Sequence, residues 1–247
     1  MSKAQLIVNW HQELAPEELA VCEDLAARRE TGEPMAYILG WKEFYGRNFA
    51  VNSGVLVPRP ETELLIDAAL AKFPVNESVL FADLGCGSGC ILATLLLEAE
   101  AWQGCGVEVS EAALAVSREN IKNHGVSDRA RLVHADFTEN PFEQSDFDLI
   151  VSNPPYISSA EYESLGFEVR NFEPRLALES GPDGLNHPRQ VVALAEKSLK
   201  PGGWLLMEIG SEQGEAAAAL LDRKIWRDVK ILADLAGLDR IVSACKN

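Results

Sequence analysis

The residues Asn153-Pro154-Pro155-Tyr156, which directly follow the apolar segment 147–152, form the clearest chemical motif of the sequence. The Asn153 side-chain oxygen is one hydrogen-bond acceptor, and the Pro154 carbonyl is a second, held rigidly because both proline rings restrict the backbone. The Tyr156 ring adds a flat face for a planar amide or base. Two acceptors can hold both hydrogens of a planar NH2 group and turn its delocalised lone pair toward an electrophile. The motif therefore indicates methylation of an amide or aromatic amine nitrogen, the alternative being a polar turn that caps a strand.

A glycine-rich loop follows the apolar segment 79–84 and leads into an apolar stretch that starts at Ile91. Glycines allow a sharp turn and close approach to a ligand, and the start of a helix offers free N–H groups. The spacing predicts a nucleotide-like cofactor site, with a plain tight turn as the alternative. Cys90 replaces the last glycine of the dinucleotide fingerprint, which argues against a pyrophosphate ligand. The predicted cofactor residues here are Asp83, Gly85, Cys86, Gly87, Ser88 and Gly89.

Acidic and aromatic residues at two further predicted strand ends complete this candidate cofactor site. Glu108 lies about twenty residues beyond the glycines, where a carboxylate can accept hydrogen bonds from ribose hydroxyls. Asp136 can accept a hydrogen bond from an exocyclic amine, and Phe137 can lie against an adenine ring. Together, the three strand ends predict an adenosine pocket.

Strands and helices alternate beyond residue 77, which predicts an α/β fold whose parallel sheet is covered on both faces. Open sheets of this kind place their sites at the carboxyl ends of the strands, where the candidate motifs lie. The predicted strands are 79–84, 105–109, 131–135, 147–152 and 204–209, and the predicted helices are 91–99, 111–123 and 189–199. Two strand-like runs, 229–234 and 239–245, have no helix between them and predict an antiparallel hairpin that closes the sheet.

The N-terminal part of the chain has a different pattern. Residues 16–29 carry apolar side chains at helical intervals and have acidic residues near their start, which predicts one amphipathic helix. Residues 41–57 are rich in aromatic and β-branched side chains and are interrupted by glycines, so they predict a short hairpin. The prolines within 57–60 end this segment, and the apolar run 64–73 then predicts another helix.

Composition and charge limit the class of protein. The chain has 247 residues, of which 47% are hydrophobic and 24% charged, as in a globular protein with one main domain. Its net charge of −16 argues against a nucleic-acid partner. No apolar run approaches the roughly 20 residues of a membrane span. The five cysteines include no Cys-x-x-Cys pair, and the four histidines show no ligand spacing. We therefore expect a cytoplasmic protein with reduced cysteines, no membrane contact and no metal.

With these residues in view, the chain resembles the class I S-adenosylmethionine-dependent methyltransferases. More narrowly, it resembles the HemK/PrmC family of protein-(glutamine-N5) methyltransferases, which modify peptide chain release factors. The resemblance extends from about Leu14 to the end of the chain. Beside the 153–156 loop, it rests on residues 32–40, the hairpin residues 44–46, and residues 57–63, 173–178, 181–185 and 234–240.

The resemblance implies a Rossmann-like seven-stranded sheet, mostly parallel with one antiparallel strand. It also implies a shortened N-terminal helical segment (1–33), a β-hairpin linker (34–58) and a methyltransferase domain (59–247), since the family usually has a fuller helical bundle at its start. The implied cofactor is S-adenosyl-L-methionine, and the implied substrate is the glutamine in the Gly-Gly-Gln motif of release factors. We expect the short first segment to affect docking rather than chemistry, while the sequence predicts no oligomeric state.

The same resemblance implies roles for individual residues. The implied cofactor contacts are Gly85 to Gly89, Glu108, Phe137 and Asn153. Glu108 stands where the family usually has an aspartate, and its longer carboxylate can do the same work. The implied substrate residues are Asn153, Pro154, Pro155 and Tyr156, which hold the glutamine amide, together with Arg59, Glu61 and Thr62 from a motif at the domain junction.

Three other functions share parts of this pattern. A ribosomal-protein glutamine methyltransferase would use the same 153–156 loop, although residues 59–63 and the closing Asp239-Arg240 segment favour release factors. A DNA adenine N6-methyltransferase would use the loop on a base, but the net charge of −16 and the absence of a basic stripe in the sequence argue against DNA. A non-catalytic S-adenosylmethionine-binding protein is a further alternative, which the intact loop disfavours.

Overall fold

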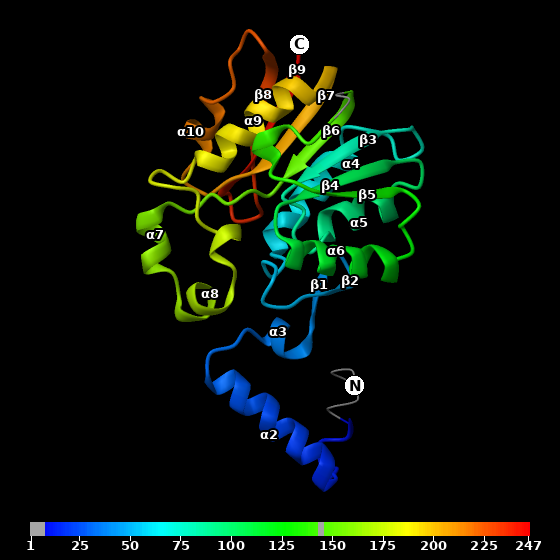
Figure 1. The fold of residues 1–247 in the computed structure, drawn as a ribbon, viewed down its shortest axis with the longest axis vertical. Helices are drawn as coiled ribbons and strands as arrows, with labels where there is room; N and C mark the ends of the chain where they lie inside the picture. The colour runs from blue at the N-terminus through cyan, green and yellow to red at the C-terminus, as the bar shows by residue number, and fades with distance from the viewer. Residues whose placement is uncertain (1–7, 143–145) are drawn as a thin grey trace.

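The structure, a computed structural model, describes residues 8–142 and 146–247. Its main body is a seven-stranded sheet with helices on both faces (Figure 1). The strand order is β5-β4-β3-β6-β7-β9-β8. The strands are β3 (Leu80–Leu84), β4 (Gln103–Glu108), β5 (Ala130–His134), β6 (Phe147–Ser152), β7 (Leu199–Glu208), β8 (Trp226–Ala233) and β9 (Asp239–Lys246).

Strand direction within this sheet confirms the predicted topology. The neighbours from β5 to β7 pair in parallel, whereas β9 runs antiparallel to both β7 and β8. The hairpin predicted at the end of the chain is therefore present, and its second strand inserts between β7 and the first. Strand β3 lies between β4 and β6, so the chain changes direction across the sheet at this point, where open α/β sheets bind ligands.

Helices cover the two faces because alternate strand residues point in opposite directions. Along β3, Phe81 packs into the cluster on one face and Ala82 into the cluster on the other. The helices that contribute to the first cluster are α4 (Glu63–Leu70), α5 (Cys90–Glu98) and α6 (Glu111–Asn123). The second cluster receives α9 (Asn186–Ser198) and α10 (Gly214–Ala218).

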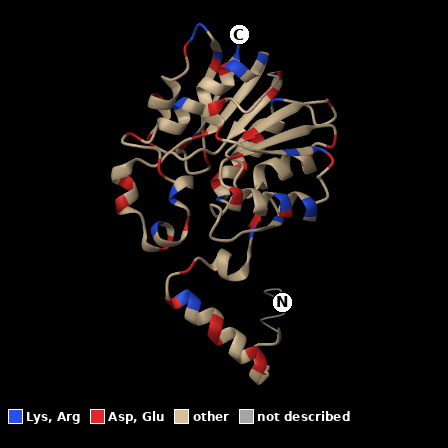
Figure 2. Cartoon of the chain, viewed as in Figure 1, with Lys and Arg blue, Asp and Glu red and all other residues tan. Residues whose placement is uncertain are grey.

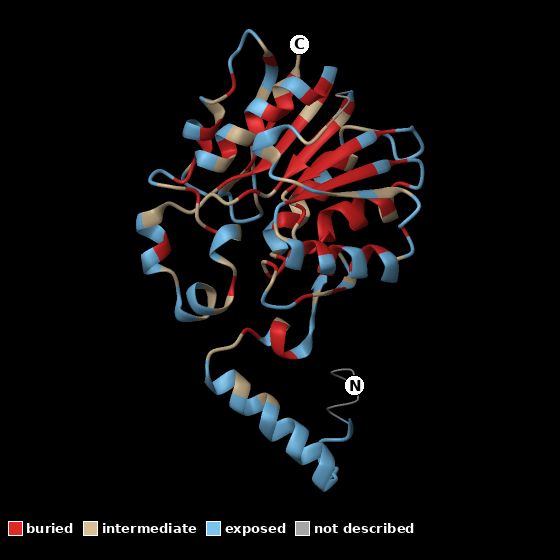
Figure 3. Ribbon diagram, in the orientation of Figure 1, coloured by how far each residue is buried: buried red, intermediate tan, exposed pale blue. Residues whose placement is uncertain are grey.

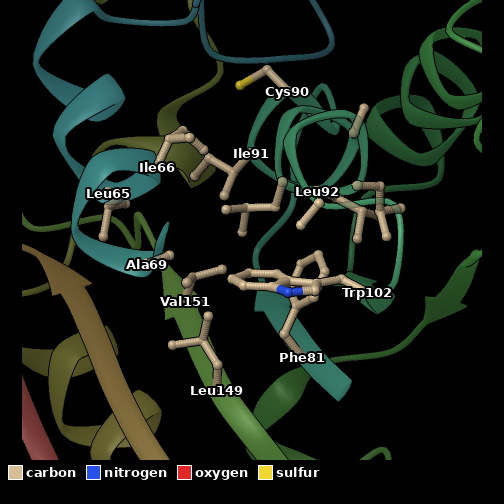
Figure 4. Packing of buried hydrophobic residues seen from close by; sticks show 14 of the residues in the cluster. Leu65, Ile66, Ala69, Phe81, Cys90, Ile91, Leu92, Trp102, Leu149 and Val151 are labelled. Carbon is tan, nitrogen blue, oxygen red and sulfur yellow. The ribbon is translucent and has the colours of Figure 1, made fainter. Parts of the chain in front are cut away.

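The first cluster anchors α5, the helix that follows the glycine-rich loop. Leu92 of α5 is fully buried and lies near Trp102 and Phe81, whose rings meet edge to face with centroids 5.9 Å apart (Figure 4). Leu149 and Val151 of β6 close the cluster from the sheet side. Because α5 is apolar almost all round, its packing fixes the position of the loop at its N-terminus.

The N-terminal elements are α2 (Pro16–Glu30), α3 (Met35–Leu39) and an antiparallel hairpin of β1 (Trp41–Phe44) and β2 (Arg47–Ala50). The hairpin turns at Tyr45 and Gly46, which both have positive φ, as a two-residue turn requires. Helix α2 carries acidic residues in its first turn and arginines in its last, complementing the helix dipole (Figure 2). None of its residues, all of which the structure describes, is buried (Figure 3).

The structure confirms most of the predicted helices and strands to within about three residues, and 147–152 and 111–123 match at both ends. The strand predicted over 204–209 begins earlier, at Leu199, and the hairpin predicted over 41–57 ends at Ala50. The helix predicted over 64–73 is shorter, because a 3₁₀ turn (Pro60–Thr62) precedes α4 and α4 ends at Leu70. Two short helices between β6 and β7 were not predicted, α7 (Ser159–Ser164) and α8 (Phe167–Phe172). Within the described ranges, no helix is long and apolar enough to cross a membrane.

Candidate active site

A pocket of about 250 Å³ opens at the carboxyl ends of β3, β4, β5 and β6. It receives the glycine-rich loop from β3, Glu108 from β4, the segment after β5, and the loop after β6. The predicted site residues that line it are Arg59, Thr62, Gly85, Cys86, Gly87, Ser88, Glu108, Asp136, Phe137, Asn153 and Pro155.

Five further predicted site residues are described but do not line this pocket: Asp83, Gly89, Pro154, Tyr156 and Glu61. Asp83 is buried beneath the loop, where its Oδ2 accepts the Leu92 N–H at 3.2 Å. Gly89 is the N-cap of α5, and Glu61 lies in the 3₁₀ turn before α4. Asp83, Gly89 and Glu61 therefore lie beside the residues that line the pocket. Pro154 and Tyr156 belong to the loop that carries Asn153.

The glycine-rich loop takes a backbone path that other residues rarely adopt. Gly85, Gly87 and Gly89 all have positive φ, at 72°, 54° and 76°. The backbone N–H groups of Gly85 and Cys86 both donate to the Val107 carbonyl of β4, at 2.9 and 3.0 Å. These hydrogen bonds attach the loop to β4, and residues Gly85–Ser88 of the loop line the pocket.

Helix α6 holds the same loop through two polar side chains that were not predicted as site residues. The Ser117 hydroxyl donates to the Gly87 carbonyl at 2.7 Å, and Asn120 Nδ2 donates to the Ser88 carbonyl at 2.8 Å. Both residues are buried on the face of α6 that also carries Leu114 and Ile121. Polar residues on an otherwise apolar helix face are the signal that could have identified them.

Glu108 bridges the loop and the next helix. Its Oε2 accepts the Gly87 N–H and its Oε1 accepts the Ser110 N–H, each at 2.9 Å. Charge-assisted hydrogen bonds of this kind hold the carboxylate in one orientation at the pocket wall. Each carboxylate oxygen can accept a second hydrogen bond, so the group can also receive ligand hydroxyls.

Asp136, Phe137 and His187 also line the pocket, and the Phe137 ring lies beside Gly85 of the glycine-rich loop. Asp136 caps a 3₁₀ turn by accepting the Thr138 N–H at 2.8 Å, and the Phe137 ring meets His187 edge to face, with centroids 6.2 Å apart. Burial lowers the pKa of His187, which favours the neutral imidazole, while nearby Asp136 opposes this shift. The wall thus combines an aromatic face with a carboxylate, as expected for a purine site, and His187 was not predicted.

The loop after β6 is fixed to three other elements. Asn153 Nδ2 donates to Thr62 Oγ1 at 3.0 Å, which leaves the Asn153 Oδ1 available toward the pocket. The Tyr156 hydroxyl donates to Glu208 Oε1 at 3.4 Å, and its carbonyl accepts Gln213 Nε2 at 2.8 Å. Burial is the main cause of a raised pKa of Tyr156, so the phenol stays protonated. The loop therefore has the rigidity that its two prolines predict.

Two of the quoted sequence motifs meet at the pocket entrance. Arg59 Nη2 pairs with Glu173 Oε1 at 2.6 Å, and Glu173 Oε2 also accepts the Val57 N–H at 3.1 Å. Glu173 is buried, whereas Arg59 is partly exposed and lines the pocket with Pro174. Residues 57–63 and 173–178 are distant in the sequence, so this contact was not predictable from spacing.

These groups match the chemical parts of an adenosine-containing cofactor. The glycines allow close approach to the backbone, Glu108 can accept ribose hydroxyls, and Phe137 offers an aromatic face. Cβ atoms built at Gly85 and Gly87 meet no other atom closer than 4.0 Å, so these glycines leave open space at the wall. The described residues therefore fit such a group.

A seven-stranded sheet with one antiparallel strand and a pocket at the carboxyl strand ends is the class I methyltransferase fold. Solved structures share it. A methyltransferase from Pyrococcus furiosus has a TM-score of 0.60 at 17% identity, over 91% of this chain and 98% of that chain. The Thermus thermophilus 16S rRNA N2 G1207 methyltransferase, in complex with AdoMet and guanosine, has a TM-score of 0.58 at 19% identity, over 84% of this chain and 50% of that chain. At these identities the likeness concerns the fold alone.

Sequence relatives define the family. The methyltransferase small domain model matches residues 61–167, and the PrmC N-terminal domain model matches residues 1–40. The release factor glutamine methyltransferase of Nitratidesulfovibrio vulgaris is 48% identical, over 91% of this chain and 76% of its own length. The release factor glutamine methyltransferase of Geobacter sulfurreducens is 43% identical, over 98% of this chain and 84% of its own length. The chain therefore belongs to the release factor glutamine methyltransferase family, as the sequence motifs predicted, and is a methyltransferase.

Proposed function

We propose that this protein transfers a methyl group from S-adenosyl-L-methionine to the side-chain amide nitrogen, N5, of the glutamine in the Gly-Gly-Gln motif of release factors. The observation that carries the proposal is the Asn153 orientation. Its Nδ2 is engaged by Thr62, so that its Oδ1 can accept a hydrogen bond from a substrate amide in the pocket. The names of the relatives supply the substrate class.

In the bound complex, S-adenosylmethionine supplies an electrophilic methyl group on a sulfonium. Gly85–Ser88 line the pocket and would let the cofactor lie close to the backbone, Glu108 would accept its ribose hydroxyls, and Asp136 and Phe137 would contact its adenine. Asp83 and Gly89 would support the cofactor site indirectly, because they fix the conformation of the loop and of the first turn of α5. The cofactor would therefore bind along the glycine-rich loop.

The substrate amide would bind between Asn153 and Pro154. The Asn153 Oδ1 and the Pro154 carbonyl accept its two hydrogens, while Pro155 and Tyr156 form the rigid flat wall beside it. This holds the nitrogen lone pair toward the methyl group, which an amide in water does only rarely because its lone pair is delocalised. Once methylated, the cationic nitrogen is acidic enough to lose a proton to water, so no side-chain base is required.

The entrance residues would recognise the protein around the glutamine. Arg59 is oriented by the buried Glu173, and Glu61 and Thr62 lie on the adjoining 3₁₀ turn. We assign docking of the release factor partly to the 1–33 segment and the 34–58 linker, and chemistry to residues 59–247. All five cysteines are free thiols, which supports a cytoplasmic location. The net charge of −16 favours a protein over a nucleic acid as substrate.

The experiment is to incubate the purified protein with labelled S-adenosylmethionine and a recombinant release factor. Peptide mass spectrometry should find one added methyl group on the Gly-Gly-Gln glutamine, and none when that glutamine is replaced by asparagine. Matched reactions with a ribosomal protein fraction and with an adenine-containing DNA duplex test the two rival substrates. Cofactor binding without transfer to any of them would support the non-catalytic alternative and contradict the proposal.

A further inference from the structure

Beneath the 153–156 loop lies a buried carboxyl group, Glu208, which the proposed chemistry does not use. It is the last residue of β7, is 1% exposed and pairs with Ile241 of β9. Its Oε1 accepts the Tyr156 hydroxyl at 3.4 Å, and no hydrogen-bond donor in the described ranges lies within 3.5 Å of its Oε2 with suitable geometry. A buried acid with so few partners is costly to fold, which indicates a role other than stability.

The groups around Glu208 come from three elements. Thr62 and Glu61 face it from the 3₁₀ turn before α4, Tyr156 from the loop after β6, and Arg240 from β9. Thr62, Arg240 and Tyr156 favour the ionised carboxylate, whereas burial and Glu61 oppose it. Burial is the largest influence, and the pKa of Glu208 rises to about 7.

Thr62 connects Glu208 to Asn153. Thr62 is 3% exposed, accepts Asn153 Nδ2 at 3.0 Å and is close enough to Glu208 to lower the pKa of that carboxyl group. A hydroxyl carries one hydrogen. When Thr62 donates this hydrogen to the carboxylate, which can only accept, its oxygen presents lone pairs to Asn153. Asn153 must then direct its NH2 toward Thr62 and its Oδ1 to the opposite side.

We propose that Glu208 is a positioning residue for methyl transfer. Through the Thr62 hydroxyl it fixes which edge of the Asn153 amide faces the substrate, and through the Tyr156 hydroxyl it fixes the ring beside that amide. A reversed Asn153 would present its own NH2 to the NH2 group of the substrate, two donors without an acceptor. The inference rests on the proposed function, since it explains how the amide-binding loop is kept in its productive orientation.

The first test is Glu208→Gln, which keeps the shape of the side chain. The new amide can donate to Thr62, which frees the Thr62 hydrogen to turn toward Asn153 and stabilises the reversed amide. We expect kcat for a glutamine-containing substrate to fall on the order of tenfold, while the Kd for S-adenosylmethionine stays within about twofold. The control is Glu196→Gln on α9, where the carboxyl accepts the Trp226 indole N–H at 3.1 Å, away from the pocket, and kcat should not change.

Thr62 variants separate positioning from packing. Thr62→Val keeps the volume and loses the hydroxyl, so kcat should fall about as far as in Glu208→Gln. Thr62→Ser keeps the hydroxyl and should retain more of kcat than Thr62→Val. In the double variant of Glu208→Gln and Thr62→Val the losses should be clearly less than multiplicative, because both changes break one chain of contacts.

The pH profile is the readout that packing alone does not change. Only ionised Glu208 is restricted to accepting, so kcat at saturating cofactor should rise as the pH increases through about 7. In Glu208→Gln this rise should disappear, leaving a low rate that is flat over the same range. If Glu208→Gln keeps both the wild-type kcat and the wild-type pH profile, the inference is wrong and the proposed function stands.

A measurement independent of activity tests the inference even when release factors are not the substrate. The side-chain NH2 resonances of Asn153, assigned by comparison with Asn153→Asp, should titrate in the wild-type protein with a midpoint near pH 7. They should not titrate in that range in Glu208→Gln. Asn153 signals that do not respond to pH in the wild-type protein would overturn the coupling between Glu208 and the loop.

Discussion

The pocket and helix α2 are held in the structure in different ways. Around the pocket, side chains of α6, β4 and the 3₁₀ turn before α4 each hydrogen-bond to one of the two loops. Helix α2 has no buried residue, and its tie to α8 is the exposed ion pair of Arg29 with Glu168, 2.7 Å long. Exposed ion pairs contribute little free energy, usually well under about 1 kcal/mol.

This difference indicates that the pocket and helix α2 contribute differently to activity and stability. A site that must hold a weak nucleophile against an electrophile needs groups fixed by their surroundings, and the pocket has them. A segment without buried residues contributes little to the stability of the rest, and the apolar side chains of Leu19 and Val21 in α2 are exposed to solvent. Changes in the pocket should therefore affect rate and cofactor binding, and changes in α2 should leave the free energy of unfolding almost unchanged.

The largest effect is expected from Asn153→Ala. This variant removes one of the two acceptors for the substrate amide, and kcat should fall by about 10²–10³-fold, as when one pre-positioned group at a reacting centre is lost. The measurement is single-turnover methyl transfer to the release factor. Asn123→Ala, at the exposed end of α6, serves as the matched control and should keep the wild-type rate. An Asn153→Ala protein with full activity would contradict the assigned role of the loop.

Gly87→Ala tests the glycine-rich loop. At φ 54° an alanine is strained by about 1 kcal/mol, and its methyl group would occupy open space at the pocket wall. We expect the affinity for S-adenosylmethionine, measured by calorimetry, to fall about tenfold. Gly125→Ala provides the comparison, because Gly125 has a φ of 71° with nothing near it and does not line the pocket. Equal affinity losses in the two variants would mean that backbone strain alone is responsible.

Asp83 makes stability depend on pH. Burial raises the pKa of Asp83 to about 7, so the folded protein favours the protonated carboxyl group more than the unfolded chain does. The resulting stabilisation is fully present below the ordinary pKa, near 4, and is lost as the pH rises through about 7. The free energy of unfolding should therefore fall from pH 5 to pH 8 by at least about 1 kcal/mol more in the wild-type protein than in Asp83→Asn. Urea unfolding at several pH values measures this, and parallel curves would contradict it.

The smallest effect is expected in α2. Leu19 is 48% exposed, so Leu19→Ala should change the free energy of unfolding by less than about 0.5 kcal/mol. Leu92→Ala, in the first core cluster, is the contrasting variant and should cost about 2–5 kcal/mol. A loss above about 2 kcal/mol for Leu19→Ala would show that α2 is packed in solution and would remove the distinction between the two regions.

The elements that strict periodicity encodes were predictable. Residues 111–123 repeat apolar positions at helical spacing, and 147–152 are mostly apolar, so both were predicted to the residue. The helices α7 and α8 were missed because each has only six residues, too few to show a helical repeat of apolar positions. Their local signal was the capping box at Ser158 and Glu161, whose side chains satisfy the first turn of α7.

The candidate active site also combines features that local sequence encodes with features that only the tertiary structure creates. Local sequence alone indicated the glycine-rich loop, Glu108 and the 153–156 loop, because glycine conformation, strand ends and proline rigidity are properties of short segments. Only the tertiary structure brought Glu208 beneath Tyr156, Thr62 against Asn153 and Glu173 beside Arg59. The reason is physical: a chain segment carries its own backbone preferences, whereas the partner of a buried polar group is decided by which distant strands and turns pack together.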